Sequence, residues 1–352
     1  MRAADPPKVL DGVVRFRVPD AGYDSVELMC DRAITLPSNA FRLHDGVWEL
    51  RVPRPPLRRF EYQLSVRDAT GRRDILDPSN PATVPTAFGQ RSVCELPGYR
   101  PPWWLSAPAA GGTWAALAVD GEVDDPVPVT MWTPTCLPDD RPAPLLLVHD
   151  GPEYDLLARV TQYCGALIHA ATLPAHRVAL LHPVDRDAWY SASPRYLRTE
   201  VEAGLAALDQ RYAVSGPVVV MGASLGGLTA LLAGLVGAPR IGGVFSQSGS
   251  FFRVVRDHET VSGYRYYDRI TAHVGAVLAA RHTDHPLRIG LTCGVLEENV
   301  ANNRDMAASL RRAGHRVSFT EVPDLHNYTA WRDCLDPGLT EVLRDCWGAP
   351  GK

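Results

Sequence analysis

A serine lies between two glycines where an apolar strand pattern gives way to a helix pattern. The continuously apolar run Val218–Met221 predicts a strand buried on both faces, and the small-residue apolar segment after Ser224 predicts a helix. Gly222 and Gly226 allow a turn too sharp for side chains two positions before and after the serine. Such a turn raises the hydroxyl above the edge of a sheet, beside the Leu225 amide at a helix N-terminus. The pattern predicts that Ser224 is a nucleophile; the alternative interpretation is a glycine-rich packing turn.

A serine hydroxyl attacks a carbonyl efficiently only when a base accepts its proton and an acid orients that base. With this type of turn, the three groups follow one another along the chain as serine, acid and histidine. His326 lies in the loop expected after the last strand, whereas His315 begins that strand. Glu297 follows the preceding strand and is the preferred acid. Glu298 beside it, Asp324, or the absence of a third group are the alternatives.

The developing oxyanion needs a second backbone donor besides the amide of Leu225. The loop after the apolar run "LLLV" supplies Gly151, whose missing side chain lets a ligand approach the backbone. Pro152 has no N–H, so the donor is Gly151 or Glu153. His149 has no partners at the spacing of metal ligands, so we expect no metal site, and nothing in the pattern predicts a cofactor.

Two kinds of hydrophobic pattern divide the chain. Residues 1–100 alternate apolar and polar positions, as in "GVVRFRVP" and "FEYQLSVRD", with turn signals between them, which predicts an antiparallel β-sandwich. Residues 101–112 are rich in proline and glycine and are expected to form a linker. Residues 113–352 alternate buried-strand and helix patterns, which predicts an α/β domain with a doubly wound, mostly parallel sheet.

The composition excludes several classes of partner. The 352 residues are 45% hydrophobic and 22% charged, with a net charge of −4, so we expect no nucleic-acid or membrane binding. The seven cysteines are scattered without a CxxC pair, which favours reduced thiols. The segment "MRAADPPKVLDG" has no apolar core of a signal peptide, and no apolar run reaches about 18 residues. These features predict a cytoplasmic protein; they do not determine its oligomeric state.

Four segments together resemble a known family. "GASLGGLTALLAGL", "SQSGS", the Asp150-Gly151 turn and "HNYTAWR" are similar to the enterochelin (enterobactin) esterases and their relatives in the esterase-D superfamily, over roughly residues 115–348. The resemblance implies an α/β-hydrolase fold preceded by an immunoglobulin-like β-sandwich. It also implies a triad of Ser224, His326 and Glu297, although some relatives work with a Ser–His dyad. Gly151 and Leu225 would frame the oxyanion hole.

By the same resemblance, the substrate is a cyclic tri-catecholate siderophore, whose ester bonds are hydrolysed to release iron. Two features depart from the family pattern: Pro152 follows the Asp-Gly turn where related mycolyltransferase-like enzymes donate an amide, and His326 lies in L-H-N instead of G-H-D. Both departures bear on the identity of the substrate more than on the class of reaction.

A ferric catecholate is anionic and aromatic, so arginine and aromatic side chains near the serine would bind it. Residues 185–198 and 250–269 carry such side chains after expected strand ends; the alternative is an ordinary arginine-rich surface. The candidate substrate-binding residues are Arg186, Trp189, Arg195, Tyr196 and Arg253.

The sequence thus predicts a serine esterase acting on a small-molecule ester. An acyltransferase or a thioesterase-like enzyme of a biosynthetic pathway could use the same triad, and a non-catalytic ligand-binding protein is a further alternative. In the sandwich, Trp48, Phe60 and Tyr62 are expected to fill the core; the alternative is that they stack on carbohydrate.

Overall fold

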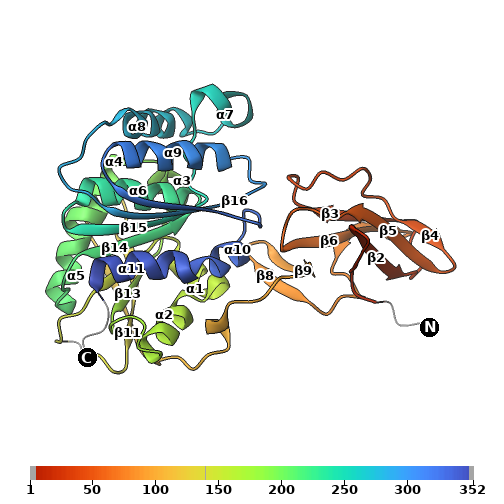
Figure 1. Cartoon of the computed structure of the whole chain (residues 1–352), viewed down its shortest axis with the longest axis horizontal. Coiled ribbons are helices and arrows are strands. Elements are labelled where there is room, and N and C mark those ends of the chain that lie inside the picture. The colour runs from red at the N-terminus through yellow and green to blue at the C-terminus, as the bar shows by residue number, and fades with distance from the viewer. Residues whose placement is uncertain (1–4, 139, 349–352) are drawn as a thin grey trace. The chain divides into compact units, whose positions relative to one another are not determined.

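The computed structural model describes residues 5–138 and 140–348, which divide into two compact units (Figure 1). The first unit comprises residues 1–101 together with two short segments from the C-terminal half of the chain, 294–297 and 323–329. The second unit comprises residues 102–293, 298–322 and 330–352.

The first unit contains two antiparallel sheets. One has the order β1-β2-β5-β4, and the other has the order β3-β6-β9-β8, with β7 also pairing with β6. The strands are β1 (Lys8–Leu10), β2 (Val13–Pro19), β3 (Ser25–Cys30), β4 (Arg42–His44), β5 (Val47–Pro53), β6 (Arg59–Asp68), β7 (Gly71–Ile75), β8 (Thr83–Thr86) and β9 (Gly89–Glu95).

Alternation of apolar residues builds the core between these two sheets. Along β2 the buried positions are every second residue, and Phe16 among them is fully buried. Its ring lies 5.2 Å from that of Tyr62 and 6.3 Å from that of Phe60, both on β6. Trp48, Phe60 and Tyr62 are 7%, 1% and 0% exposed, so they fill the sandwich core and offer no face to a sugar.

The second unit is built on an eight-stranded sheet with the order β10-β11-β13-β12-β14-β15-β16-β17. Pairing is antiparallel from β10 to β13 and parallel from β13 through β12, β14 and β15 to β16. The strands are β10 (Gly112–Val119), β11 (Val127–Pro134), β12 (Leu145–Val148), β13 (Arg177–Leu181), β14 (Val218–Ala223), β15 (Ile241–Gln247), β16 (Arg288–Gly294) and β17 (Arg316–Val322).

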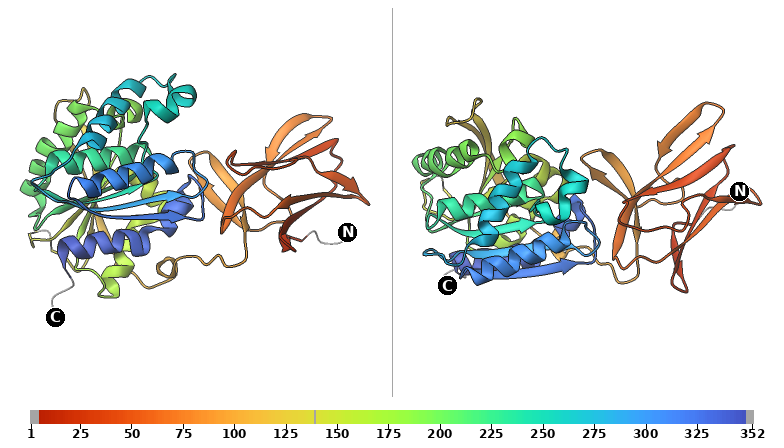
Figure 2. Two further views of the ribbon diagram at one scale, coloured as in Figure 1. Left: turned by 45° about the horizontal axis from the view of Figure 1, so that its top comes forward. Right: turned by 90° about the horizontal axis from the view of Figure 1, so that it is seen from above.

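Helices cover both faces of this sheet, with α6, α8 and α9 on one face and α1, α2 and α11 on the other (Figures 1 and 2). The α-helices are α1 (Gly151–Ala158), α2 (Val160–His169), α3 (Arg186–Tyr190), α4 (Pro194–Arg198), α5 (Leu205–Tyr212), α6 (Leu225–Gly237), α7 (Val254–Val261), α8 (Tyr267–Ala279), α9 (Val300–Arg312), α10 (Tyr328–Asp333) and α11 (Thr340–Trp347). The layered arrangement explains why β12 and β14 read as continuously apolar: both are buried along their whole length.

The sequence patterns also predict one continuous helix over 154–171 and another over 193–212, and the structure divides both. The helical pattern over 154–171 is divided into α1 and α2, because Arg159 has a left-handed φ of 55° and ends the first helix. The amphipathic pattern over 193–212 is interrupted by a π-helical turn at Thr199–Gly204, which lies between α4 and α5.

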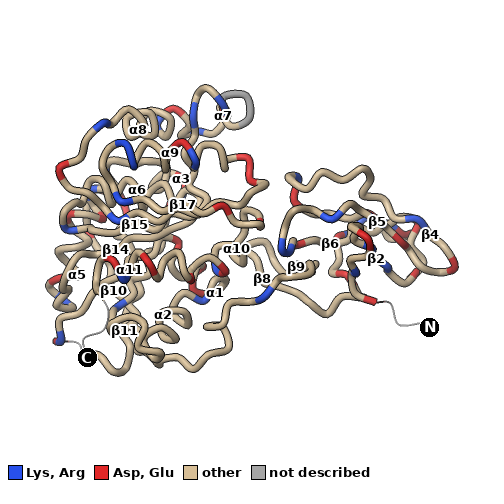
Figure 3. Tube along the Cα trace, in the orientation of Figure 1, with Lys and Arg blue, Asp and Glu red and all other residues tan. Residues whose placement is uncertain are grey.

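Acidic and basic residues alternate along both units instead of gathering by sign (Figure 3), in keeping with the small net charge of −4. Within the described residues, no helix has the length and apolarity needed to span a membrane.

Candidate active site

Ser224 occupies the turn between β14 and α6 in a strained conformation, with φ 57° and ψ −122°. Three backbone hydrogen bonds hold it there. Its N–H donates to the carbonyl of Gln247 at 2.9 Å, and its carbonyl accepts from the amides of Leu228 and Ser250, each at 3.1 Å. The turn is therefore fixed both by its own helix and by the loop after β15.

Close packing explains the glycines around the serine. A Cβ on Gly222 would lie 2.4 Å from the carbonyl oxygen of Gly226, so no other residue fits without moving the turn. A Cβ on Gly227 would lie 2.8 Å from the hydroxyl of Ser246, so α6 approaches β15 closely at this point. The glycine pattern of the sequence thus predicted the local geometry correctly.

A second serine lies beside the candidate nucleophile. The hydroxyl oxygens of Ser224 and Ser250 are 3.3 Å apart, and Ser250 is 5% exposed. Sequence reasoning used the "SQSGS" segment only as a family marker and missed this contact. The signal was present, because this loop follows the strand next to β14 in a parallel sheet. The indole N–H of Trp331 donates to the hydroxyl of Ser248 at 3.0 Å and so orders the same loop.

The two predicted oxyanion residues begin helices that follow neighbouring strands. Gly151 is the first residue of α1 after β12, and Leu225 is the first residue of α6 after β14. The first amides of a helix have no acceptor within that helix, so both can donate to a ligand. A Cβ on Gly151 would lie 2.4 Å from Cα of Leu180, which explains the glycine at this position.

Arg186, a predicted substrate-binding residue, holds the Asp150-Gly151 turn in place. Its guanidinium donates to both carboxylate oxygens of Asp150, each at 2.8 Å. Asp150 has a left-handed φ of 53°, and its amide donates to the hydroxyl of Tyr190 at 3.2 Å. These bonds hold the residue before Gly151 in a conformation that a non-glycine residue rarely adopts. Binding of a substrate by Arg186 stays a prediction.

A buried ion pair lies directly before that residue. Nδ1 of His149 donates to the carbonyl of Met221 at 2.9 Å, and Nε2 lies 3.0 Å from the carboxylate of Glu200. Burial lowers the pKa of His149, but the Glu200 carboxylate and the two hydrogen bonds outweigh it, so the pKa is raised above 6.5. Nothing in the sequence around His149 predicts this pair, because Glu200 lies 51 residues further along the chain.

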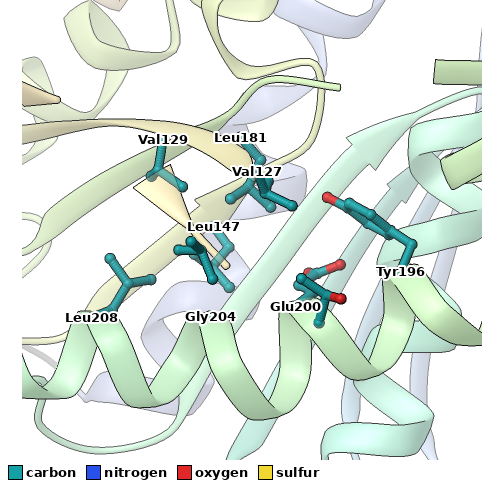
Figure 4. Close-up of a pocket in the computed structure, with 10 residues that line it drawn as sticks. Val127, Val129, Leu147, Leu181, Tyr196, Glu200, Gly204 and Leu208 are labelled. Atoms are coloured by element: carbon teal, nitrogen blue, oxygen red, sulfur yellow. The ribbon is translucent and has the colours of Figure 1, made fainter. Parts of the chain in front are cut away.

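A cavity of about 10 Å³ lies next to Glu200 in the core of the second unit (Figure 4). This volume holds about one water molecule and no substrate group. Six apolar side chains, three side chains with polar groups and one glycine surround it: Val119, Val127, Val129, Leu147, Leu181, Leu208, Tyr196, Thr199, Glu200 and Gly204.

The predicted base and acid contact one another within the first unit. Nδ1 of His326 lies 2.7 Å from Oε2 of Glu297, and Oε1 of the same carboxylate accepts from the amide of Gly294 at 2.7 Å. Glu297 is 6% exposed, whereas the side chain of His326 is 39% exposed. A proton held on Nδ1 by the carboxylate leaves Nε2 as the basic nitrogen. Glu298 is exposed to solvent, so the structure distinguishes the two candidate acids by their contacts.

The remaining predicted substrate residues make internal contacts. Trp189 and Tyr196 are 7% and 0% exposed, and their rings stack with centroids 5.3 Å apart. Arg195 pairs with Asp124 at 2.9 Å, and Arg253 pairs with Asp305. In this structure Tyr196 is therefore part of the core. Contacts of all these residues with a substrate stay predictions.

Comparison with known proteins shows the family of the chain. Residues 120–342 match the model of a family described as "Putative esterase". The chain belongs to this esterase family. A curated protein, the iron(III) enterobactin esterase of Escherichia coli O6:H1, is 29% identical to the chain over 221 residues. That match covers 59% of this chain and spans about half (50%) of the length of the curated relative.

Solved structures share the whole fold of this esterase-family chain. An enterobactin esterase of Shigella flexneri, crystallised in the presence of enterobactin, has a TM-score of 0.75 at 20% identity, covering 98% of this chain and 96% of its own. The ferric enterobactin esterase of Salmonella typhimurium has a TM-score of 0.76 at 21% identity, with 98% and 97% covered. These likenesses confirm the predicted α/β-hydrolase fold with an N-terminal β domain, and the family match confirms the resemblance stated from the motifs.

Replacing Glu297 by Gln tests the acid. The amide cannot hold the proton on Nδ1 of His326 as a carboxylate does, so we expect kcat for an aryl ester to fall by about 10⁴-fold. Glu298→Gln is the matched control and should leave kcat within about twofold. Equal losses in both variants would contradict the assignment of Glu297.

The His149–Glu200 pair predicts a pH dependence of stability. Because the folded pKa of His149 is raised above 6.5, its contribution is complete below about pH 6.5 and is lost as the pH rises through the folded pKa. Urea denaturation at a series of pH values should show that the free energy of unfolding of the wild-type protein falls as the pH rises above 6.5. In His149→Asn the free energy of unfolding should depend less on pH over the same range.

His176 provides a control of opposite sign. Burial lowers its pKa to about 4, so its effect is a loss of stability as the pH falls below 6.5. His176→Asn should therefore flatten the acid side of the profile and leave the alkaline side unchanged. An alkaline loss that persists in His149→Asn would rule out the His149 pair as its source.

Proposed function

We propose that this protein is a serine carboxylic-ester hydrolase with Ser224 as the nucleophile. The observation that carries the proposal is the strained turn at Ser224, since a strained backbone persists only where surrounding contacts enforce it and is typical of functional sites. Membership of the esterase family supports the same reaction class.

The first half of the reaction forms an acyl-enzyme. Nε2 of His326 accepts the proton of Ser224 as the hydroxyl oxygen attacks the ester carbonyl, and Glu297 stabilises the resulting imidazolium through Nδ1. Negative charge develops on the former carbonyl oxygen, which the amides of Leu225 and Gly151 stabilise. His326 then donates its proton to the leaving alcohol as the ester bond breaks.

The second half repeats these roles with water as the nucleophile. His326 accepts a proton from water, the hydroxide adds to the acyl carbon, and the proton returns to Ser224 as the acid product leaves. The hydroxyl of Ser250 lies 3.3 Å from that of Ser224. Before the attack, Ser250 can therefore donate a hydrogen bond to the nucleophile or accept one from it.

We propose a tri-catecholate trilactone siderophore, or a related ester, as the substrate. The support is the similarity to an iron(III) enterobactin esterase and to enterobactin esterases crystallised in the presence of enterobactin or of 2,3-di-hydroxy-N-benzoyl-serine. Arg186, Arg195 and Arg253 are the cations proposed to meet the anionic complex. Such a substrate would be processed in the cytoplasm, in keeping with seven scattered cysteines that include no CxxC pair.

Ser224→Ala tests the nucleophile. Loss of the attacking oxygen should lower kcat for a simple aryl ester by about 10⁴-fold or more, while the circular dichroism spectrum and the melting temperature stay near those of the wild type. A fluorophosphonate should label the wild-type protein at Ser224 and leave the variant unlabelled. Full activity in the variant would refute the proposal.

Incubation with iron-free and ferric tri-catecholate trilactones tests the substrate. Hydrolysis should add one water mass for each ester bond cleaved, which mass spectrometry resolves as a linear trimer, dimer and monomer. Cleavage of aryl esters without cleavage of the trilactones would contradict the proposed substrate. In that event, added alcohols or amines would show whether the acyl-enzyme prefers an acceptor other than water, as an acyltransferase would.

A further inference from the structure

An arginine lies fully buried at the edge of the sandwich core. Arg59 begins β6, has 0% of its surface exposed, and belongs to the first compact unit. Burial of a guanidinium is costly unless charged and hydrogen-bonding partners surround it. Its partners therefore indicate why an arginine is present at this position.

The partners of Arg59 lie on both sides of His326. Nε of Arg59 is 3.0 Å from Oδ2 of Asp324, and Nη2 donates to the side-chain oxygen of Asn327. Nη1 donates a hydrogen bond to Oε1 of Glu61 at 3.3 Å, so a residue of the same strand, β6, also holds the guanidinium. One planar group thus joins the residue two before His326 to the residue directly after it.

The same loop has two further anchors in the sandwich. The amide of Arg58 donates to the carbonyl of Pro323 at 2.8 Å, and Leu325 is 2% exposed within the hydrophobic core of the sandwich. Val295 and Leu296, which directly precede Glu297, pack against that core as well. The segments that carry the base and the acid are therefore both built into the core of the first unit.

The two segments also touch one another through their backbones. A Cβ on Gly294 would lie 2.4 Å from the carbonyl oxygen of Asp324, so the chain entering the acid segment packs directly on the residue that Arg59 holds. A displacement of Asp324 would therefore change both the position of His326 and its 2.7 Å contact with Glu297.

We propose that Arg59 is a positioning residue for the catalytic base: through Asp324 and Asn327 it fixes the loop that holds His326 against Glu297. This inference rests on the proposed function, because the role of His326 as the base belongs to it. The sandwich thereby serves the reaction directly, since one of its strands sets the geometry of the acid–base pair.

Stability alone is a weak explanation for this arginine. Buried ion pairs contribute little net stability compared with well-packed apolar groups of the same size. The orientation of a catalytic group has a larger effect on the rate, because a displacement of about 1 Å can cost about 10²-fold in rate. The fork of Arg59 reaches two loop residues at once, which a single ammonium group could not do.

Two variants and one control test the proposal on the full-length protein. Arg59→Lys keeps the charge but loses the fork, and Asn327→Ala removes one acceptor without leaving a buried charge unpaired. Tyr62→Phe is the control: Tyr62 lies on the same strand, and its buried hydroxyl donates to Asp77 at 2.7 Å, within the first unit but away from the histidine loop.

We expect kcat for an aryl ester to fall by about 10- to 100-fold in Arg59→Lys and Asn327→Ala, with KM within about twofold. Tyr62→Phe should retain wild-type kcat per folded molecule. The double variant should lose little more than either single variant, because both break the same link. Equal kcat in Arg59→Lys and Tyr62→Phe, or fully additive losses, would overturn the proposal.

A spectroscopic measurement separates this inference from the proposed function. Long-range ¹H–¹⁵N spectra of the imidazole show which nitrogen of His326 carries the proton. We expect one tautomer, protonated at Nδ1, in the wild type and in Tyr62→Phe, and a mixture in Arg59→Lys. An unchanged tautomer in Arg59→Lys would overturn the positioning role, whereas wild-type protein without any ester turnover would overturn the proposed function instead.

Discussion

The parallel pairing of β12, β14 and β15 is the constraint on which the candidate site depends. Val148 pairs with Met221, and Ala223 pairs with Gln247, so the three strands end together at one edge of the sheet. The loops that leave this edge carry Gly151, the serine turn and Ser250. Backbone hydrogen bonds of the sheet, and the close approach of Gly222 to the backbone of Gly226, thus bring together groups that lie far apart in the sequence.

Charge pairs hold the segments that leave the sheets, and the pairs of His149 and Arg59 are buried. His149–Glu200 directly precedes the Asp150-Gly151 turn, Asp150–Arg186 holds the left-handed residue of that turn, and Arg59–Asp324 holds the loop of His326, the proposed base. Each pair joins segments at least 36 residues apart. Because such pairs add little net stability but tolerate few geometries, they suit positions where orientation matters more than free energy.

The sequence predicted the parts of the fold that follow from local patterns. Continuous apolar runs predicted β12 and β14, alternation predicted the sandwich strands, and the spacing of Gly222, Ser224 and Gly226 predicted the turn. The sequence did not predict the break between α1 and α2, because the break depends on the left-handed backbone of Arg159 and an arginine gives no indication of that conformation. The sequence did not predict long-range pairs either. Arg186 and Tyr196 were predicted as substrate-binding residues, and nothing in the sequence indicated that Arg186 pairs with Asp150 or that Tyr196 is fully buried.

Ester chemistry and substrate choice depend on different parts of this molecule. The proposed reaction needs two backbone amides, one serine and one oriented histidine. The backbone fold places both amides and the serine where β12 and β14 end. A solved enterobactin esterase can therefore have the same fold over 98% of this chain although only 20% of the aligned residues are identical. Substrate choice depends on the side chains that line the site, which the backbone fold does not determine. Pro152 follows Gly151 in the first turn of α1 and cannot donate an amide, so the predicted second oxyanion donor is Gly151 or Glu153.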